Sequence, residues 1–184
     1  MEEIIKDGEN RMQKSINTLK EELKKLRTGR ASPHILESIK VNYYGQEIPI
    51  IQIAGIGVPE PKMIVIKPYD KNIVSEIEKA ILKSGIGLTP KVEGGIIKIP
   101  IPPLSEERRK ELVKLVKKFG EESKIALRNI RRDLMEKIKQ KKENGEISED
   151  EAEILKKRIE SLTEKKIGEI EEIIKIKERE IMEE

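Results

Sequence analysis

Three stretches of the sequence carry apolar residues at helical spacing. The first, from residue 3 to residue 28, is a seven-residue repeat of Ile5, Met12, Leu19 and Leu26 that Ile16 and Leu23 widen. The second, from residue 105 to residue 143, contains Leu112, Val116, Phe119, Ala126, Leu127, Ile130 and Leu134. The third follows residue 148 and contains Ile154, Leu155, Ile159, Leu162, Ile167, Ile170 and Ile174. Because helices this rich in charge are not stable alone in water, we expect the three to pack as a three-helix bundle.

Between the first and second stripes the spacing of apolar residues changes to that of strands. Ile35–Tyr44, Ile48–Val58 and Met63–Lys67 read as strands, and Gly94–Gly95 as the turn of a closing hairpin that ends in Ile96–Ile99. Asn72–Ser84 has helical spacing and stops at Gly85. This stretch therefore predicts a small inserted α+β module, so the fold class is α+β.

Glycine and proline mark the junctions between these parts. The first helix should end between Thr28 and Ser32, because Pro33 disfavours helical geometry in the residue before it. Ser105 is a suitable N-cap for the second helix, and Ser148 with Glu151 has the spacing of a capping box for the third. We expect a bundle of residues 1–30 and 105–184, an inserted domain of residues 31–104, and a hinge where the two chain crossings run. The hinge residues would be Gly29, Arg30, Ala31, Ser32, Pro33, Pro102, Pro103 and Leu104.

The charges are sorted along the chain. The net charge of the 184 residues is only +3, but residues 105–143 hold 14 Lys and Arg against 8 Asp and Glu, and residues 144–184 hold 8 against 14. On the second helix, the basic residues gather opposite the apolar stripe, interrupted only by Glu121. We call this row the basic stripe: Lys110, Lys114, Lys117, Lys124, Arg128, Arg131, Arg132 and Lys139. A merely solvated face would mix its signs, whereas clustered arginines suit phosphate groups.

Several classes of function find no support in the sequence. There is no Cys and His34 is the single His, so neither a His-based metal site nor a catalytic triad can be assembled. The glycine pairs lack the spacing of a phosphate-binding loop. No apolar run approaches the length of a membrane span, and the N-terminus does not resemble a signal peptide. We therefore expect a cytoplasmic protein that is not an enzyme and needs no metal or cofactor.

Four motifs resemble those of the bacterial ribosome recycling factor family, and they occur in order along the full chain. They are Leu26–Pro33, Tyr43–Gly45, Pro102–Lys110 and Arg128–Asp133. The resemblance implies an L-shaped monomer of roughly tRNA size, with a three-helix bundle and a β/α/β domain. It further implies that the bundle binds the large ribosomal subunit across the A and P sites. With elongation factor G and GTP, such a protein splits the post-termination ribosome into subunits and releases mRNA and tRNA.

The resemblance also assigns residues. It matches Arg128, Arg131 and Arg132 to the arginines that contact ribosomal RNA, Arg108 and Arg109 to a pair opening the basic helix, and Arg30 to an arginine beside the hinge. The RNA-binding set that we predict is Arg108, Arg109, Lys110, Lys117, Lys124, Arg128, Arg131 and Arg132. The alternative is a coiled-coil adaptor that uses its basic face against acidic proteins. Salt-dependent binding to ribosomes would separate the two.

Overall fold

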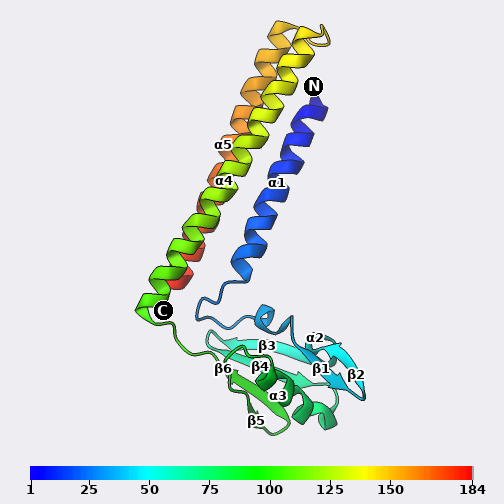
Figure 1. Cartoon of the computed structure of the whole chain (residues 1–184), viewed down its shortest axis with the longest axis vertical. Helices are drawn as coiled ribbons and strands as arrows, with labels where there is room; N and C mark the ends of the chain where they lie inside the picture. The colour runs from blue at the N-terminus through cyan, green and yellow to red at the C-terminus, as the bar shows by residue number, and fades with distance from the viewer. Residues whose placement is uncertain (184) are drawn as a thin grey trace. The chain divides into compact units, whose positions relative to one another are not determined.

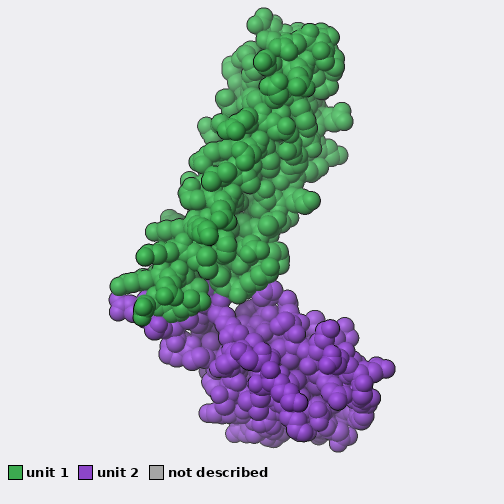
Figure 2. Space-filling view, viewed as in Figure 1, with its two compact units in different colours: residues 1–26, 107–183 green, residues 27–106, 184 purple. Residues whose placement is uncertain are grey.

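The computed structural model describes residues 1–183, which divide into two compact units (Figure 2). The first unit contains residues 1–26 and 107–183, and the second contains residues 27–106. The second unit is thus inserted between the first and second long helices of the first (Figure 1). This architecture confirms the predicted fold class, a three-helix bundle with an inserted α+β module.

The first unit consists of α1 (Glu2–Lys24), α4 (Glu106–Glu143) and α5 (Glu149–Met182), which run side by side (Figure 1). Each helix buries one apolar stripe, as expected for a bundle, although Ile154 of the predicted third stripe is 55% exposed and Leu155 is buried in its place. Glycines allow the helices to approach closely. A Cβ added at Gly8 of α1 would lie 2.6 Å from Leu134 of α4, and one added at Gly120 of α4 would lie 2.8 Å from Ile174 of α5.

Local signals set the turn between α4 and α5. Gly145 has a φ of +74°, its N–H donates to the Lys142 carbonyl, and the Glu146 N–H donates to the Lys141 carbonyl. This pair of bonds is a Schellman motif, which satisfies the last carbonyls of α4. The predicted capping box then opens α5: Ser148 Oγ accepts from the Glu151 N–H at 3.1 Å, and Glu151 accepts from the Ser148 N–H at 2.8 Å.

The second unit is built on a four-stranded antiparallel sheet in the order β3-β4-β6-β5. These strands are β3 (Ala54–Glu60), β4 (Met63–Pro68), β5 (Lys91–Glu93) and β6 (Ile96–Pro100). A hairpin of β1 (Lys40–Tyr43) and β2 (Gln46–Pro49) and the helix α3 (Val74–Lys83) complete the unit. Two 3₁₀ turns, η1 (Pro33–Leu36) and η2 (Lys71–Ile73), precede β1 and α3. Isoleucine is the commonest residue of the core, and the sheet and α3 contribute Ile64, Ile66, Ile77, Ile81, Ile97 and Ile99.

The structure corrects three of the predicted elements. Of the expected strand Ile35–Tyr44 only Lys40–Tyr43 is a strand, because its first residues belong to the 3₁₀ turn η1. The first helix ends at Lys24, not between Thr28 and Ser32. Arg27, three residues later, already belongs to the second unit, where its guanidinium donates to the Ile86 carbonyl. The expected strand Ile48–Val58 is interrupted by one helical turn, α2 (Ile50–Ile53). That turn places Ile50 and Ile53 in the core and leaves Ile51 exposed, a three-residue spacing that a strand could not satisfy.

The hairpin turns follow the sequence. Gly94 and Gly95 have φ values of +59° and +77°, so the closing hairpin has a type I′ turn. Tyr44 and Gly45 join β1 to β2 with φ values of +50° and +87°. Tyr44 is the one described non-glycine residue with a positive φ, and its hydroxyl donates to Asp70 at 2.8 Å.

Candidate nucleic-acid interface

The basic stripe lies on the face of α4 opposite the residues that pack in the bundle. Burial along the helix recurs at Leu112, Val116, Gly120, Ser123, Leu127, Ile130, Leu134 and Ile138. A different face of the helix carries Lys110 and, at helical spacing after it, Lys114, Lys117, Arg128 and Arg132. All five are exposed. The amphipathic pattern that buries one side of α4 therefore presents these cations to solvent.

Three arginines of the stripe have no protein partner. Among residues 1–183, Arg128, Arg131 and Arg132 make neither an ion pair nor a side-chain hydrogen bond. Two other arginines of the bundle differ: Arg11 contacts Asp133 at 2.6 Å, and Arg158 contacts Glu2 at 2.7 Å. Each unpartnered guanidinium keeps its full set of N–H donors for a ligand such as a phosphate.

The acid next to these arginines is held elsewhere. Asp133 directly follows Arg132, yet its carboxylate accepts a hydrogen bond from Arg11 of α1 and lies 3.9 Å from Lys137. The hydrogen bond and charge of Arg11 lower the pKa of Asp133 below its ordinary value. Because Arg11 neutralises this carboxylate, the positive potential of the stripe is not cancelled by its nearest acid.

Lys124 stands apart from the rest of the stripe. Its ammonium lies 3.4 Å from Glu121 of its own helix and 3.3 Å from Glu171 of α5, and its side chain is only 18% exposed. The pair with Glu171 links α4 to α5. Lys124 therefore acts first as a bundle residue, which the sequence could not indicate because Glu171 lies far along the chain.

Arg108 and Arg109 also lie off the stripe. Arg108 pairs with Glu111 at 3.0 Å. Arg109 precedes the buried residues Leu112 and Val116 by three and seven positions, so it shares their face, and its Nε is buried without a partner within the described residues. The predicted RNA-binding set thus separates into Lys110, Lys117, Arg128, Arg131 and Arg132 on one exposed face and the other three residues elsewhere.

Several of the predicted hinge residues are fixed to the second unit. The Ala31 N–H donates to the Pro61 carbonyl at 2.7 Å, and the Ile101 N–H donates to the Lys62 carbonyl at 2.8 Å. Ser32 caps η1 by accepting from the His34 N–H, and Pro33 is the first residue of that turn. Both chain crossings are therefore anchored to the same loop between β3 and β4.

The remaining hinge residues lack such anchors. Gly29 has a φ of +78°, which a side chain would disfavour, and Arg30 is exposed. Pro102, Pro103 and Leu104 lie outside any helix or strand. Only some of the predicted hinge residues are therefore without backbone hydrogen bonds to the second unit. They are the hinge residues nearest in sequence to the ends of α1 and α4.

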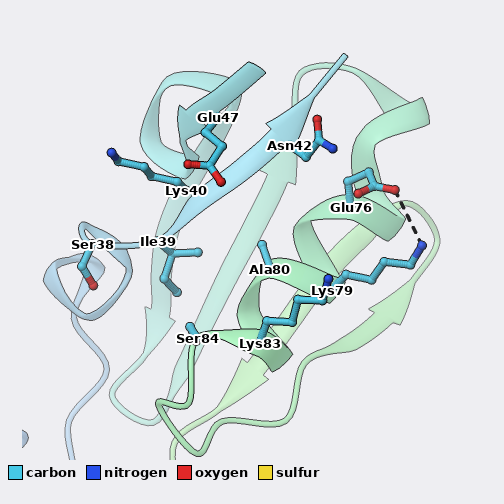
Figure 3. A pocket seen from close by; sticks show the side chains of 10 residues that line it. All are labelled: Ser38, Ile39, Lys40, Asn42, Glu47, Glu76, Lys79, Ala80, Lys83 and Ser84. Carbon is cyan, nitrogen blue, oxygen red and sulfur yellow. Dashed lines mark ion pairs between the residues drawn. The ribbon is translucent and has the colours of Figure 1, made fainter. Parts of the chain in front are cut away.

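A cavity of about 490 Å³ in the second unit opens between the β1–β2 hairpin and α3 (Figure 3). Its lining includes Lys40, Lys79 and Lys83, and within it Lys79 pairs with Glu76 at 3.7 Å. The ten lining residues include no histidine.

Residues 1–183 also lack the groups for two other kinds of site. No three His, Cys, Asp or Glu side chains converge on a point where a metal ion could be held. No helix in the same range is long and apolar enough to cross a membrane.

One exposed apolar residue interrupts the basic stripe. Ile125 is 53% exposed and lies three residues before Arg128 and seven before Arg132, on the same face of α4. Sequence reasoning passed over it, although its absence from the apolar stripe was visible in the helical spacing.

Comparisons with known proteins agree with the motifs. The sequence model of the family described as Ribosome recycling factor matches residues 19–182. The chain is 49% identical to a ribosome-recycling factor of Geobacillus sp. over 183 residues, covering 100% of this chain and 99% of that protein. It is 52% identical to a ribosome-recycling factor of Acetivibrio thermocellus over 178 residues, covering 97% of each.

Solved structures give the same result. The solution structure of a ribosome recycling factor matches with a TM-score of 0.75 and 45% identity, covering 100% of this chain and 97% of the other. A T. thermophilus ribosome recycling factor, placed with E. coli elongation factor G on the E. coli post-termination complex, matches with a TM-score of 0.66 and 40% identity, covering 98% of each chain. This protein belongs to the ribosome recycling factor family.

Proposed function

We propose that this protein binds the post-termination ribosome in the cytoplasm and, with elongation factor G and GTP, promotes its dissociation into subunits, which frees mRNA and tRNA. The protein itself carries out no catalysis, and the energy comes from the partner GTPase. Family membership over nearly the whole chain supports this function. A relative of 40% identity occupies a post-termination complex together with elongation factor G.

The observation that carries the RNA-binding part of the proposal is the row of unpartnered arginines on α4. Arg128, Arg131 and Arg132 keep all their donors free, while the neighbouring Asp133 is neutralised by Arg11. Ribosomal RNA of the large subunit, in the region of the A and P sites, offers closely spaced phosphates that such a row can bind bidentately. Lys110 and Lys117 extend the same surface toward the start of α4.

The hinge is the second part of the proposal. Elongation factor G would move the inserted unit, and the bundle would transmit that movement to the contacts between the ribosomal subunits. Gly29 and Arg30 on one crossing, and Pro102 to Leu104 on the other, would absorb the change in backbone angles. Ala31, Ser32 and Pro33 would move with the inserted unit, because their bonds lie within it.

Light scattering of purified post-termination ribosomes, mixed with this protein, elongation factor G and GTP, tests the function directly. The wild-type protein should lower the scattering as 70S particles separate. A triple variant, Arg128→Ala with Arg131→Ala and Arg132→Ala, should lose this activity because it no longer holds the ribosome. The matched control replaces three exposed, unpaired lysines away from the stripe, Lys20, Lys157 and Lys165, with Ala. It removes the same charge and should stay active, whereas equal losses in both variants would contradict the assignment.

A further inference from the structure

Ile125 has no structural reason to occupy its position on α4. Its side chain is 53% exposed, whereas the bundle-facing residues Leu127 and Leu134 are completely buried. An exposed helix position favours Ala, Lys, Glu or Arg, and a β-branched side chain lowers helix propensity there. A residue that contributes neither packing nor propensity is a candidate for contact with a ligand.

A second residue of low helix propensity lies one turn further on. Asn129 is exposed, and its amide makes no hydrogen bond with any of residues 1–183. An unpaired Asn in the middle of a helix destabilises it relative to Lys or Glu. Ile125, Arg128, Asn129 and Arg132 occupy positions i, i+3, i+4 and i+7 of one helix face, which places successive Cβ atoms about 5–6 Å apart. We call these four residues the Ile125 cluster.

Three acids near the cluster are engaged with other cations, and a fourth, Glu136, accepts a hydrogen bond from the Gln140 amide at 3.4 Å. Glu121 pairs with Lys124 at 3.4 Å, and Glu122 lies 4.0 Å from Lys118. Asp133 pairs with Arg11 of α1 at 2.6 Å. No described carboxylate therefore pairs with Arg128 or Arg132, and the cluster combines an apolar surface, an amide and two open guanidinium groups.

Phosphate binding alone accounts for the arginines but not for the other two residues. An isoleucine side chain offers nothing to a phosphate, but it can pack against the face of a base or a ribose. An Asn amide carries a donor and an acceptor side by side, which matches the edge of a base. In an A-form duplex, the base faces are stacked and the base edges of the major groove are out of reach of side chains, so packing of Ile125 against the face of a base requires a nucleotide of a loop or bulge.

We propose that the Ile125 cluster receives an unstacked nucleotide of the target RNA. Ile125 packs against its base or ribose, Asn129 bonds to the base edge, and Arg128 and Arg132 bind the flanking phosphates. The inference rests on the proposed function, because it assumes that the target of the stripe is RNA. It adds that this surface recognises one base position in addition to the RNA backbone.

Ribosome binding at several salt concentrations provides the first test. Ile125→Ala and Asn129→Ala should each weaken the binding of purified 70S ribosomes by about five- to tenfold, with the salt slope unchanged, because neither residue releases counterions. The matched control is Ile154→Ala on α5, whose side chain is 55% exposed, and it should bind like the wild type. If Ile125→Ala binds as tightly as Ile154→Ala, the proposal is wrong.

Chemical probing of the ribosomal RNA provides the second test. At saturating protein, the wild type should shield at least one base from dimethyl sulfate and the adjoining backbone from hydroxyl radicals. The double variant Ile125→Ala/Asn129→Ala should leave that base reactive and keep the backbone shielded. If weaker binding comes with unchanged base protection, Ile125 contacts a ribosomal protein and the RNA contact is refuted. If the wild type itself does not bind ribosomes, the proposed function fails, a result distinct from failure of the cluster alone.

Discussion

At the scale of single residues, the partner of each charge decides which side chains remain available to a ligand. Arg11 and Arg132 are both arginines of the bundle, but Arg11 is bound to Asp133 and Arg132 has no partner among the described residues. Lys124 belongs to the basic stripe by sequence, yet two carboxylates neutralise its ammonium. A phosphate would have to compete with those carboxylates at Lys124, whereas at Arg132 it would replace only water.

The contrast between these two residues gives a prediction. In a plot of the logarithm of the ribosome-binding constant against the logarithm of salt concentration, Arg132→Ala should reduce the magnitude of the slope by about one. The reason is that one phosphate contact and its released counterion are lost. Lys124→Ala should leave that slope nearly unchanged. The measurement is the ribosome dissociation constant between low and moderate salt. Arg132→Ala should change the free energy of unfolding by less than about 0.5 kcal/mol, since the residue is exposed. A slope that falls for Lys124→Ala as much as for Arg132→Ala would disprove the distinction.

At the scale of elements, the bundle combines close packing of its helices with ion pairs across them. Because Gly120 of α4 has no side chain, Ile174 of α5 occupies the space where its Cβ would lie. Arg11 joins α1 to α4, and the bidentate pair of Arg158 with Glu2 joins α5 to the start of α1. Short-range sequence signals define the helix ends, and these contacts align the helices with one another.

Two glycine substitutions separate packing from helix propensity. At Gly168 of α5, an added Cβ meets no atom within 4 Å, so Gly168→Ala should raise the free energy of unfolding by up to about 1 kcal/mol. At Gly120, the added Cβ would lie 2.8 Å from Ile174 Cγ1, which must shift. Overpacking should outweigh the gain in propensity, so Gly120→Ala should lower the free energy of unfolding by about 1 kcal/mol. Urea unfolding of both variants measures the difference, and equal stabilisation would show that the helices are not in close contact at Gly120.

The ion pairs of α1 predict how stability depends on pH. The pKa of Asp133 is lowered by its hydrogen bond from Arg11, and that of Glu2 by its hydrogen bond from Arg158. The ordinary pKa is 3.8 for Asp and 4.5 for Glu, and a lowered pKa adds stability to the folded state at pH values above it. This added stability is lost as the pH falls through the lowered pKa. Arg11→Met should therefore reduce the loss of stability below about pH 4, as measured by urea unfolding at pH 7 and at pH 3. An unchanged pH dependence would mean that the pair contributes nothing in solution.

What could be predicted from the sequence was local. The capping box at Ser148 and the end of α4 depend on residues within one turn, and both were identified. The early end of α1 coincides with the attachment of Arg27 to Ile86 of the second unit, which lies far along the chain. The helical turn at Ile50 resembled a strand, because a short apolar run fits either spacing. For the site, the basic stripe followed from helical periodicity, but the pairing of Lys124 with Glu171 required the packed bundle.

At the scale of the whole molecule, one continuous chain forms two units with separate cores. The bundle draws on residues 1–26 and 107–183, so its stability does not require a residue of the insertion in its core. The insertion has its own aliphatic core between sheet, hairpin and α3. Separate cores allow binding and force transmission to be assigned to different units.

Deleting the insertion tests that division. A variant that joins Leu26 to Glu107 through a flexible Gly/Ser loop should fold, because every buried stripe of α1, α4 and α5 is retained. It should bind ribosomes with nearly the affinity of the full chain, since Arg128, Arg131 and Arg132 are kept. In the light-scattering assay with elongation factor G and GTP, it should not split them. Splitting at the rate of the full chain would show that the insertion is dispensable.

The last prediction concerns the hinge. The chain contains no Cys, so dyes can be attached at two introduced cysteines, Lys157→Cys on α5 and Leu82→Cys on α3, both at exposed positions. If Gly29–Arg30 and Pro102–Leu104 bend, single-molecule energy transfer between the units should give a broad distribution in the free protein. The distribution should narrow when the protein binds a ribosome, because the RNA and the neighbouring subunits restrict both units. The control places both dyes within the bundle and away from the basic stripe, at Lys157→Cys and Lys20→Cys, and should give a narrow distribution in either state. If the distribution between the units is as narrow as that control in the free protein, the units form one rigid body, and force must reach the ribosome without bending at the hinge.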